Sequence, residues 1–140
     1  MTDIGLMHYY LGMEVWQEPG HIFLGQGKYA VDILKRFRME DCRPMCTPMI
    51  TNWKQLHASE GKLVDPTLYH QLIGSLMYLV KSWPDLCFAV NTLIQFMVEP
   101  RSVHWVVAKH GLRYLSGIVD FGLDYRRSDG IRLVGFTDSY

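Results

Sequence analysis

The sequence predicts an α+β protein with β-hairpins near both ends and amphipathic helices between them. One observation is a run of aromatic and β-forming residues over 8–16 that resumes over 21–24 after a Pro-Gly turn signal. The second is the helical spacing of apolar residues in the segments that follow. The third is a pair of alternating runs, 121–125 and 131–136, around an Asp-Gly dipeptide that is typical of a hairpin turn.

The first predicted helix covers residues 26–39 and is amphipathic. Its apolar face carries Tyr29, Ala30, Ile33, Leu34 and Phe37, and its other face carries Lys28, Asp32, Lys35 and Arg36. Asp32 is spaced i,i+4 from both Lys28 and Arg36, which favours an exposed, charged face. Pro44 and Pro48 then predict an extended connector, which the polar residues 51–62 continue.

Three further helices are predicted over residues 65–80, 82–99 and 102–117. Asp65 is the expected N-cap of the first, with Pro66 behind it; Ser102 and Gly117 are the expected caps of the last. The apolar faces are wide enough for a helix-on-helix core. The expected core residues are Leu68, Tyr69, Leu72, Ile73, Leu76, Met77, Val80, Leu86, Ala89, Val90, Leu93, Ile94, Met97, Trp105, Val106, Ala108, Leu112 and Leu115.

Composition narrows the class of protein. Fourteen basic and fourteen acidic residues cancel, so no global charge favours nucleic acid or membrane. No apolar run approaches the roughly 18 residues of a membrane span, and no secretory leader pattern opens the sequence. Three cysteines then predict free thiols in an intracellular, non-secreted protein. Cys42 and Cys46 lack a second paired-ligand motif, so the sequence does not favour a zinc site.

A series of short motifs runs in order along almost the whole chain. They are YLGMEV at 10–15, GQGKYA at 25–30, YHQLIGSLMYL at 69–79, WPDL at 83–86, LRYLSG at 112–117 and LVGFTDS at 133–139. In this order they resemble the Pol polyprotein of copia-type LTR retrotransposons, from the end of the reverse transcriptase to the first strand of RNase H. Because the motifs are colinear, the resemblance is specific.

The resemblance implies a division of the chain into four parts. It assigns 1–50 to the end of the reverse transcriptase, with a primer-grip-like hairpin and a thumb-like helix, and 51–64 to a linker. It assigns 65–120 to a helical connection region and 121–140 to a hairpin leading into a truncated RNase H domain. The implied partners are an RNA–DNA or DNA duplex, held through the parent polyprotein, and the palm and RNase H parts. The parent element would work in the cytoplasm or nucleus.

The resemblance also implies that this segment is not an enzyme by itself. The parent would be an RNA-directed DNA polymerase with RNase H, and both activities need paired carboxylates around Mg²⁺. The family's polymerase pair lies upstream of the matching motifs, and this sequence contains no Asp-Asp pair. Asp138 resembles the first RNase H carboxylate, but one carboxylate cannot organise two metal ions. No complete catalytic set and no cofactor are therefore expected in the fragment.

The function that remains is to position nucleic acid. Lys and Arg contacts to phosphates place a duplex without reading its sequence. The candidate residues are Leu11 and Gly12 in the hairpin, Lys28, Lys35, Arg36 and Arg38 at the thumb-like helix, and Arg113 further on. For each cation the alternative is an ordinary solvated helix face.

Departures from the family pattern favour a decayed element copy. The positions where the family more often has Arg or Lys are Gly27, His70, Trp83, His110 and Ser116. Gly111 replaces an apolar helix former, at a cost of about 1 kcal/mol against alanine. Trp83 is left open between core packing and base stacking. The alternative function is a standalone protein-interaction module with no nucleic-acid role.

Overall fold

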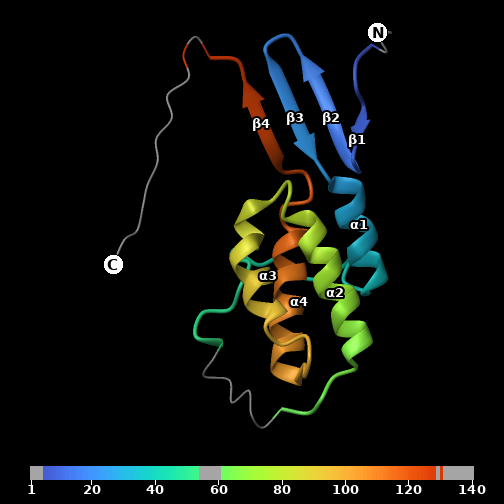
Figure 1. The fold of residues 1–140 in the computed structure, drawn as a ribbon, viewed down its shortest axis with the longest axis vertical. Helices are drawn as coiled ribbons and strands as arrows, with labels where there is room; N and C mark the ends of the chain where they lie inside the picture. The colour runs from blue at the N-terminus through green and yellow to red at the C-terminus, as the bar shows by residue number, and fades with distance from the viewer. Residues whose placement is uncertain (1–4, 54–60, 129, 131–140) are drawn as a thin grey trace.

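The structure is a computed structural model that describes residues 5–53, 61–128 and 130. A four-stranded antiparallel sheet lies at one end of a cluster of helices (Figure 1). The strands are β1 (Tyr9–Tyr10), β2 (Met13–Glu18), β3 (His21–Gly25) and β4 (Gly122–Arg126), in the spatial order β1-β2-β3-β4. The α+β class predicted from the sequence is confirmed.

The predicted N-terminal hairpin is present as β2 and β3, with Val15 opposite Leu24. The run over 8–16, however, is not one strand. It turns at Leu11 and Gly12, whose φ angles of 50° and 76° are both positive, and β1 pairs back onto β2. Two successive positive φ values suit the tight hairpin turns that match strand twist. The continuous strand was therefore a wrong prediction, because the Gly12 signal was read as strand interior.

β4 completes the N-terminal sheet. Leu123 lies opposite Leu24 and Gly122 opposite Gly25. The sequence predicted that this run would pair with residues 131–136, which lie outside the described residues, as does Asp129. A Cβ on Gly122 would lie 2.3 Å from the Leu24 carbonyl oxygen, so only glycine allows this close approach.

The helices are α1 (Gly27–Arg36), α2 (Pro66–Leu79), the 3₁₀ turn η3 (Pro84–Leu86), α3 (Cys87–Ile94) and α4 (Ser102–Ser116). α2 begins as predicted, because the Asp65 side chain accepts a hydrogen bond from the Thr67 N–H at 2.9 Å. The helix predicted over 82–99 is shorter in the structure than in the prediction. It opens as η3 and ends at Ile94, after which the N–H groups of Phe96 and Met97 bond three residues back, in tight turns.

Ser102 was wrong as the N-cap of α4, whereas Gly117 does cap its C-terminal end. The N-cap is Arg101, whose backbone N–H donates to Nδ1 of His104 at 3.0 Å, and Ser102 is the first helical residue. Gly117 caps the other end with φ −86°, in the right-handed region, so the helix does not need a glycine there for its backbone angle. The Met45 N–H bonds to the carbonyl of Arg113, which ties the segment after α1 to α4.

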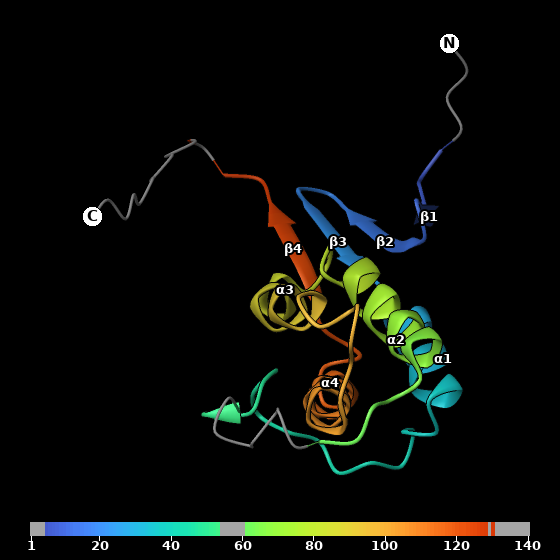
Figure 2. The same ribbon diagram turned by 60° about the horizontal axis from the view of Figure 1, so that its bottom comes forward.

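α1 to α4 surround a shared hydrophobic core, which Figure 2 shows partly along the helix axes. Tyr69, Leu72, Ile73, Leu112 and Leu115 are completely buried in it. Trp83 is only 3% exposed, so the structure places it in the core. Three expected core residues are instead substantially exposed: Leu68, Met77 and Val106. They sit at the margins of the apolar stripes, where helical spacing alone does not show which side the neighbouring helix covers.

Candidate nucleic-acid interface

The turn between β1 and β2 is fixed against α2. The Tyr78 hydroxyl donates a hydrogen bond of 2.6 Å to the Leu11 carbonyl oxygen. A Cβ on Gly12 would lie 1.9 Å from that hydroxyl, and its φ of 76° is also unfavourable for a side chain. Tyr78 in turn packs edge-on against Tyr29 of α1, with ring centroids 4.8 Å apart. The turn is therefore held by these contacts at a corner where the sheet meets two helices.

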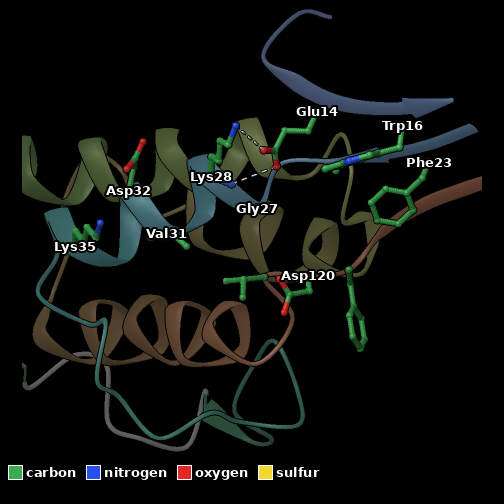
Figure 3. Close-up of a pocket in the computed structure, with 12 residues that line it drawn as sticks. Glu14, Trp16, Phe23, Gly27, Lys28, Val31, Asp32, Lys35 and Asp120 are labelled. Atoms are coloured by element: carbon green, nitrogen blue, oxygen red, sulfur yellow. Dashed lines mark hydrogen bonds and ion pairs between the residues drawn. The ribbon is translucent and has the colours of Figure 1, made fainter. Parts of the chain in front are cut away.

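Lys28 is anchored at the start of α1. Its Nζ lies 3.5 Å from Oε1 of Glu14, and its backbone N–H donates to Oε2 of Glu14 at 3.4 Å (Figure 3). Glu14 is only 8% exposed, and its carboxylate lies at the N-terminus of α1, where the helix dipole stabilises negative charge. The ammonium also lies 4.9 Å from the Tyr9 ring centroid and hydrogen-bonds the Tyr9 hydroxyl. This bond to Tyr9 is the main reason that the pKa of Lys28 is raised.

Lys81 stands over the Tyr78 ring, 4.7 Å from its centroid. Sequence reasoning missed this residue, although the i,i+3 spacing of Tyr78 and Lys81 at the end of α2 was a signal for it. Two exposed ammonium groups thus lie on tyrosine rings close to the same turn. We call this area the turn surface; its residues are Tyr9, Leu11, Gly12, Lys28, Tyr78 and Lys81.

The other predicted contact residues lie apart from the turn surface. Lys35 and Arg36 are in the last turn of α1, roughly 10 Å along the helix from Lys28 at 1.5 Å per residue. Both are exposed, and their side chains make no hydrogen bond or ion pair with another described residue. The two i,i+4 pairs expected for Asp32 do not form ion pairs among the described residues. Lys28 pairs with Glu14 instead.

Arg38 and Arg113 each lie next to other parts of the chain, away from the turn surface. Arg38 follows α1 with a φ of 55°, beside a small hollow that it lines with Glu40, Asp41 and Cys42. Nε of Arg113 donates to the carbonyl of Arg43 at 2.9 Å, so this side chain holds the connector against α4. The structure therefore brings three of the seven predicted residues together and leaves four elsewhere.

A cavity of about 670 Å³ opens between β2, β3, α1 and the loop before β4 (Figure 3). Trp16, Phe23 and Phe121 supply aromatic walls. Its charged lining residues are Glu14, Lys28, Asp32, Lys35 and Asp120. Three carboxylates against two ammonium groups do not make a basic cleft, so phosphate binding is better placed on the turn surface than in this cavity.

The magnesium ions that the family resemblance implies do not fit the described residues. Among these residues, no three His, Cys, Asp or Glu side chains gather as a metal site would require. Asp138 lies outside the described residues. Cys42, Cys46 and Cys87 are free thiols. No helix of the described chain has the length and apolar character needed to cross a membrane.

Comparison with known proteins decides the family. The chain is 40% identical over 133 residues to the retrovirus-related Pol polyprotein from transposon RE2 of Arabidopsis thaliana. It is 33% identical over 153 aligned residues to the corresponding polyprotein from transposon TNT 1-94 of Nicotiana tabacum. The chain belongs to the copia-type retrotransposon Pol sequences. The resemblance drawn from the motifs is confirmed.

This Pol segment is short beside its relatives. The matches cover 95% and 99% of the chain but only 9% and 11% of the two polyproteins. It is also 36% identical to an uncharacterized mitochondrial protein of Arabidopsis thaliana, over 99% of the chain and 58% of that protein. No family model and no solved structure matches the chain. The chain therefore corresponds to one segment of a retrotransposon polyprotein.

Proposed function

We propose that this Pol segment positions an RNA–DNA or DNA duplex during reverse transcription and supplies no catalytic group. The observation that carries the proposal is the pair of ammonium groups on the turn surface. Lys28 and Lys81 each lie over a tyrosine ring beside a turn that Tyr78 fixes in place. The Pol polyprotein relatives support the retrotransposon setting.

The turn surface suits phosphate contacts for two reasons. Lysine side chains held on aromatic rings lose less conformational freedom on binding than free ones. Glu14 and Tyr9 hold Lys28 in place, while Lys81 is exposed and offers its ammonium group to solvent. Lys35 and Arg36, roughly 10 Å further along α1, would reach about three base-pair steps away at 3.4 Å per step. The contacts would place the duplex without reading its sequence.

A fluorescence titration with a labelled RNA–DNA hybrid at two salt concentrations tests the proposal. Wild type should bind with strong salt dependence, and Lys81→Gln should weaken binding and reduce the slope of log affinity against log salt by about 0.9. Lys109→Gln is the matched control, because Lys109 also lies over an aromatic ring, Trp105, but on α4. The proposal fails if wild type shows no salt-sensitive binding, or if the two variants behave alike.

A protein-interaction module remains the second candidate function. The observation that favours it is an apolar patch on one face of the sheet, where Ile22 and its cross-strand partner Tyr125 are 39% and 54% exposed. Exposed apolar groups gathered on one element mark interaction sites more often than scattered ones do. A flat titration at low salt would leave this function as the better account.

A further inference from the structure

The cavity between the sheet and α1 has an aromatic wall on its sheet side. Trp16 of β2 and Phe23 of β3 face each other across the strand pair, with ring centroids 5.3 Å apart and planes inclined by 59°. Both rings line the cavity, together with Phe121 from the loop before β4. In Figure 3 the two strand residues lie to one side, Val31 and Lys35 follow α1 on the other, and Asp120 lies between them. The wall offers ring faces to a flat ligand group.

The charges that remain free in the cavity are mainly negative. Glu14 is neutralised by Lys28 and by the start of α1. Asp32 and Asp120 line the cavity with exposed carboxylates that make no hydrogen bond or ion pair with another described residue. Lys35 is the opposing cation in the lining. Two unpaired carboxylates against one ammonium favour a cation over a phosphate.

We propose that this cavity binds an arginine side chain of a partner polypeptide. The guanidinium group stacks on the exposed ring of Trp16, beside Phe23, and donates hydrogen bonds to the Asp120 carboxylate. Arginine suits the lining better than lysine, because its cation is planar, weakly hydrated and forked for carboxylates. A volume of about 670 Å³ exceeds what one side chain fills, so flanking peptide residues enter as well.

The partner is a polypeptide, because the unpaired carboxylates repel a nucleic-acid backbone. Lys28 and Lys35 line the cavity as well as serving the proposed duplex contacts, but the residues proposed to hold the arginine, Trp16, Phe23 and Asp120, are not duplex contacts. The two ideas can therefore fail separately. Loss of hybrid binding in Lys81→Gln with intact peptide binding, or the reverse, identifies which one is wrong.

A peptide titration tests the inference on the full chain. The probe is a capped tetrapeptide alternating arginine with glycine, and its control carries citrulline, which keeps the shape of arginine but removes the charge. Trp16 serves as the fluorescent reporter, because it is half exposed and lines the cavity, whereas Trp53 and Trp83 are buried and the partly buried Trp105 lies on α4 outside the cavity lining. Trp16→Phe keeps an aromatic ring and should remove most of the signal change. Isothermal calorimetry gives the affinity without relying on fluorescence.

The arginine peptide should bind saturably, and the citrulline peptide more weakly by at least about threefold. Asp120→Asn should weaken arginine binding by about threefold to tenfold, and the fold is preserved because Asp120 is exposed and unpaired among the described residues. Asp41→Asn, the same change at an exposed carboxylate outside the cavity, should leave the affinity unchanged. Equal binding of both peptides, equal behaviour of both variants, or no saturable binding of the arginine peptide overturns the inference.

Discussion

The helical cluster and the sheet use apolar residues in different ways. Ile73 in α2 is completely buried among side chains from neighbouring helices, whereas Ile22 in β3 is 39% exposed. The sheet extends beyond the end of the cluster, so only part of its surface lies against the helices (Figure 1). The cluster supplies the core of the fold. The sheet joins distant parts of the chain and exposes apolar side chains such as Ile22 to solvent.

The largest expected effect comes from making the same change, isoleucine to alanine, in each of the two regions. Ile73→Ala should lower the free energy of unfolding by about 2–5 kcal/mol, because it removes a fully buried side chain and leaves a cavity. Ile22→Ala should cost less than about 1 kcal/mol, because much of that side chain already meets water. Urea denaturation followed by circular dichroism measures both. Equal losses would show that the sheet contributes as much core as the helices.

The next prediction concerns the strand that closes the sheet. Gly122→Ala should destabilise the protein by about 1–3 kcal/mol, because the new Cβ would lie 2.3 Å from the Leu24 carbonyl oxygen and 2.7 Å from the Phe23 ring. Amide hydrogen exchange should show lost protection in β3 and β4 and little change in α2. Gly74→Ala is the control, because nothing lies within 4 Å of its added Cβ. Unchanged protection in β4 would contradict the β3–β4 pairing.

These two regions also differ in how far the sequence predicted them. α2 could be predicted because its signals are local: Asp65 and Pro66 mark its start, and Leu72, Ile73 and Leu76 mark its buried face. The place of β4 could not be predicted, because its partner β3 lies about a hundred residues away and periodicity carries no information on long-range pairing. The sequence pointed instead to a local hairpin partner.

The candidate site shows the same limit. Leu11, Gly12 and Lys28 were named from motifs that resemble the Pol family, and the structure places them at one corner. Lys81 was missed, because its relevance depends on where Tyr78 lies relative to the turn. The cavity was missed entirely, because the helix and the two strands that form it meet only in the folded chain. Composition gave a neutral chain and could not show how the charges are distributed.

A smaller, opposite effect is expected at a glycine of the cluster. Gly111→Ala should raise the free energy of unfolding by about 0.5–1 kcal/mol, because alanine favours the helix. The added Cβ would meet the Pro48 carbonyl oxygen at 3.7 Å and Leu76 at 3.8 Å, which are ordinary contacts. Thermal and urea denaturation should both report the gain. Destabilisation would mean that the connector packs more tightly on α4 than these distances indicate.

The last prediction tests how acid affects the cluster through His104. This side chain is 3% exposed and accepts the Arg101 N–H through Nδ1, and burial, followed by the charge of Arg101, lowers its pKa. The unfolded chain therefore binds a proton at higher pH than the folded one. The stabilisation from neutral His104 is complete above the unfolded pKa, about 6.5, and is lost as pH falls toward the lowered folded value. Stability of the cluster should thus fall on acidification below about pH 6.5.

His104→Gln separates this titration from the cap, because a glutamine at this position also accepts the N-cap N–H but carries no proton to gain. The difference in unfolding free energy between neutral and mildly acidic buffer should shrink in His104→Gln and stay unchanged in His8→Gln, an exposed histidine beside the sheet. Urea titrations at both pH values measure it. If both variants keep the wild-type difference, His104 is not the source of the acid sensitivity.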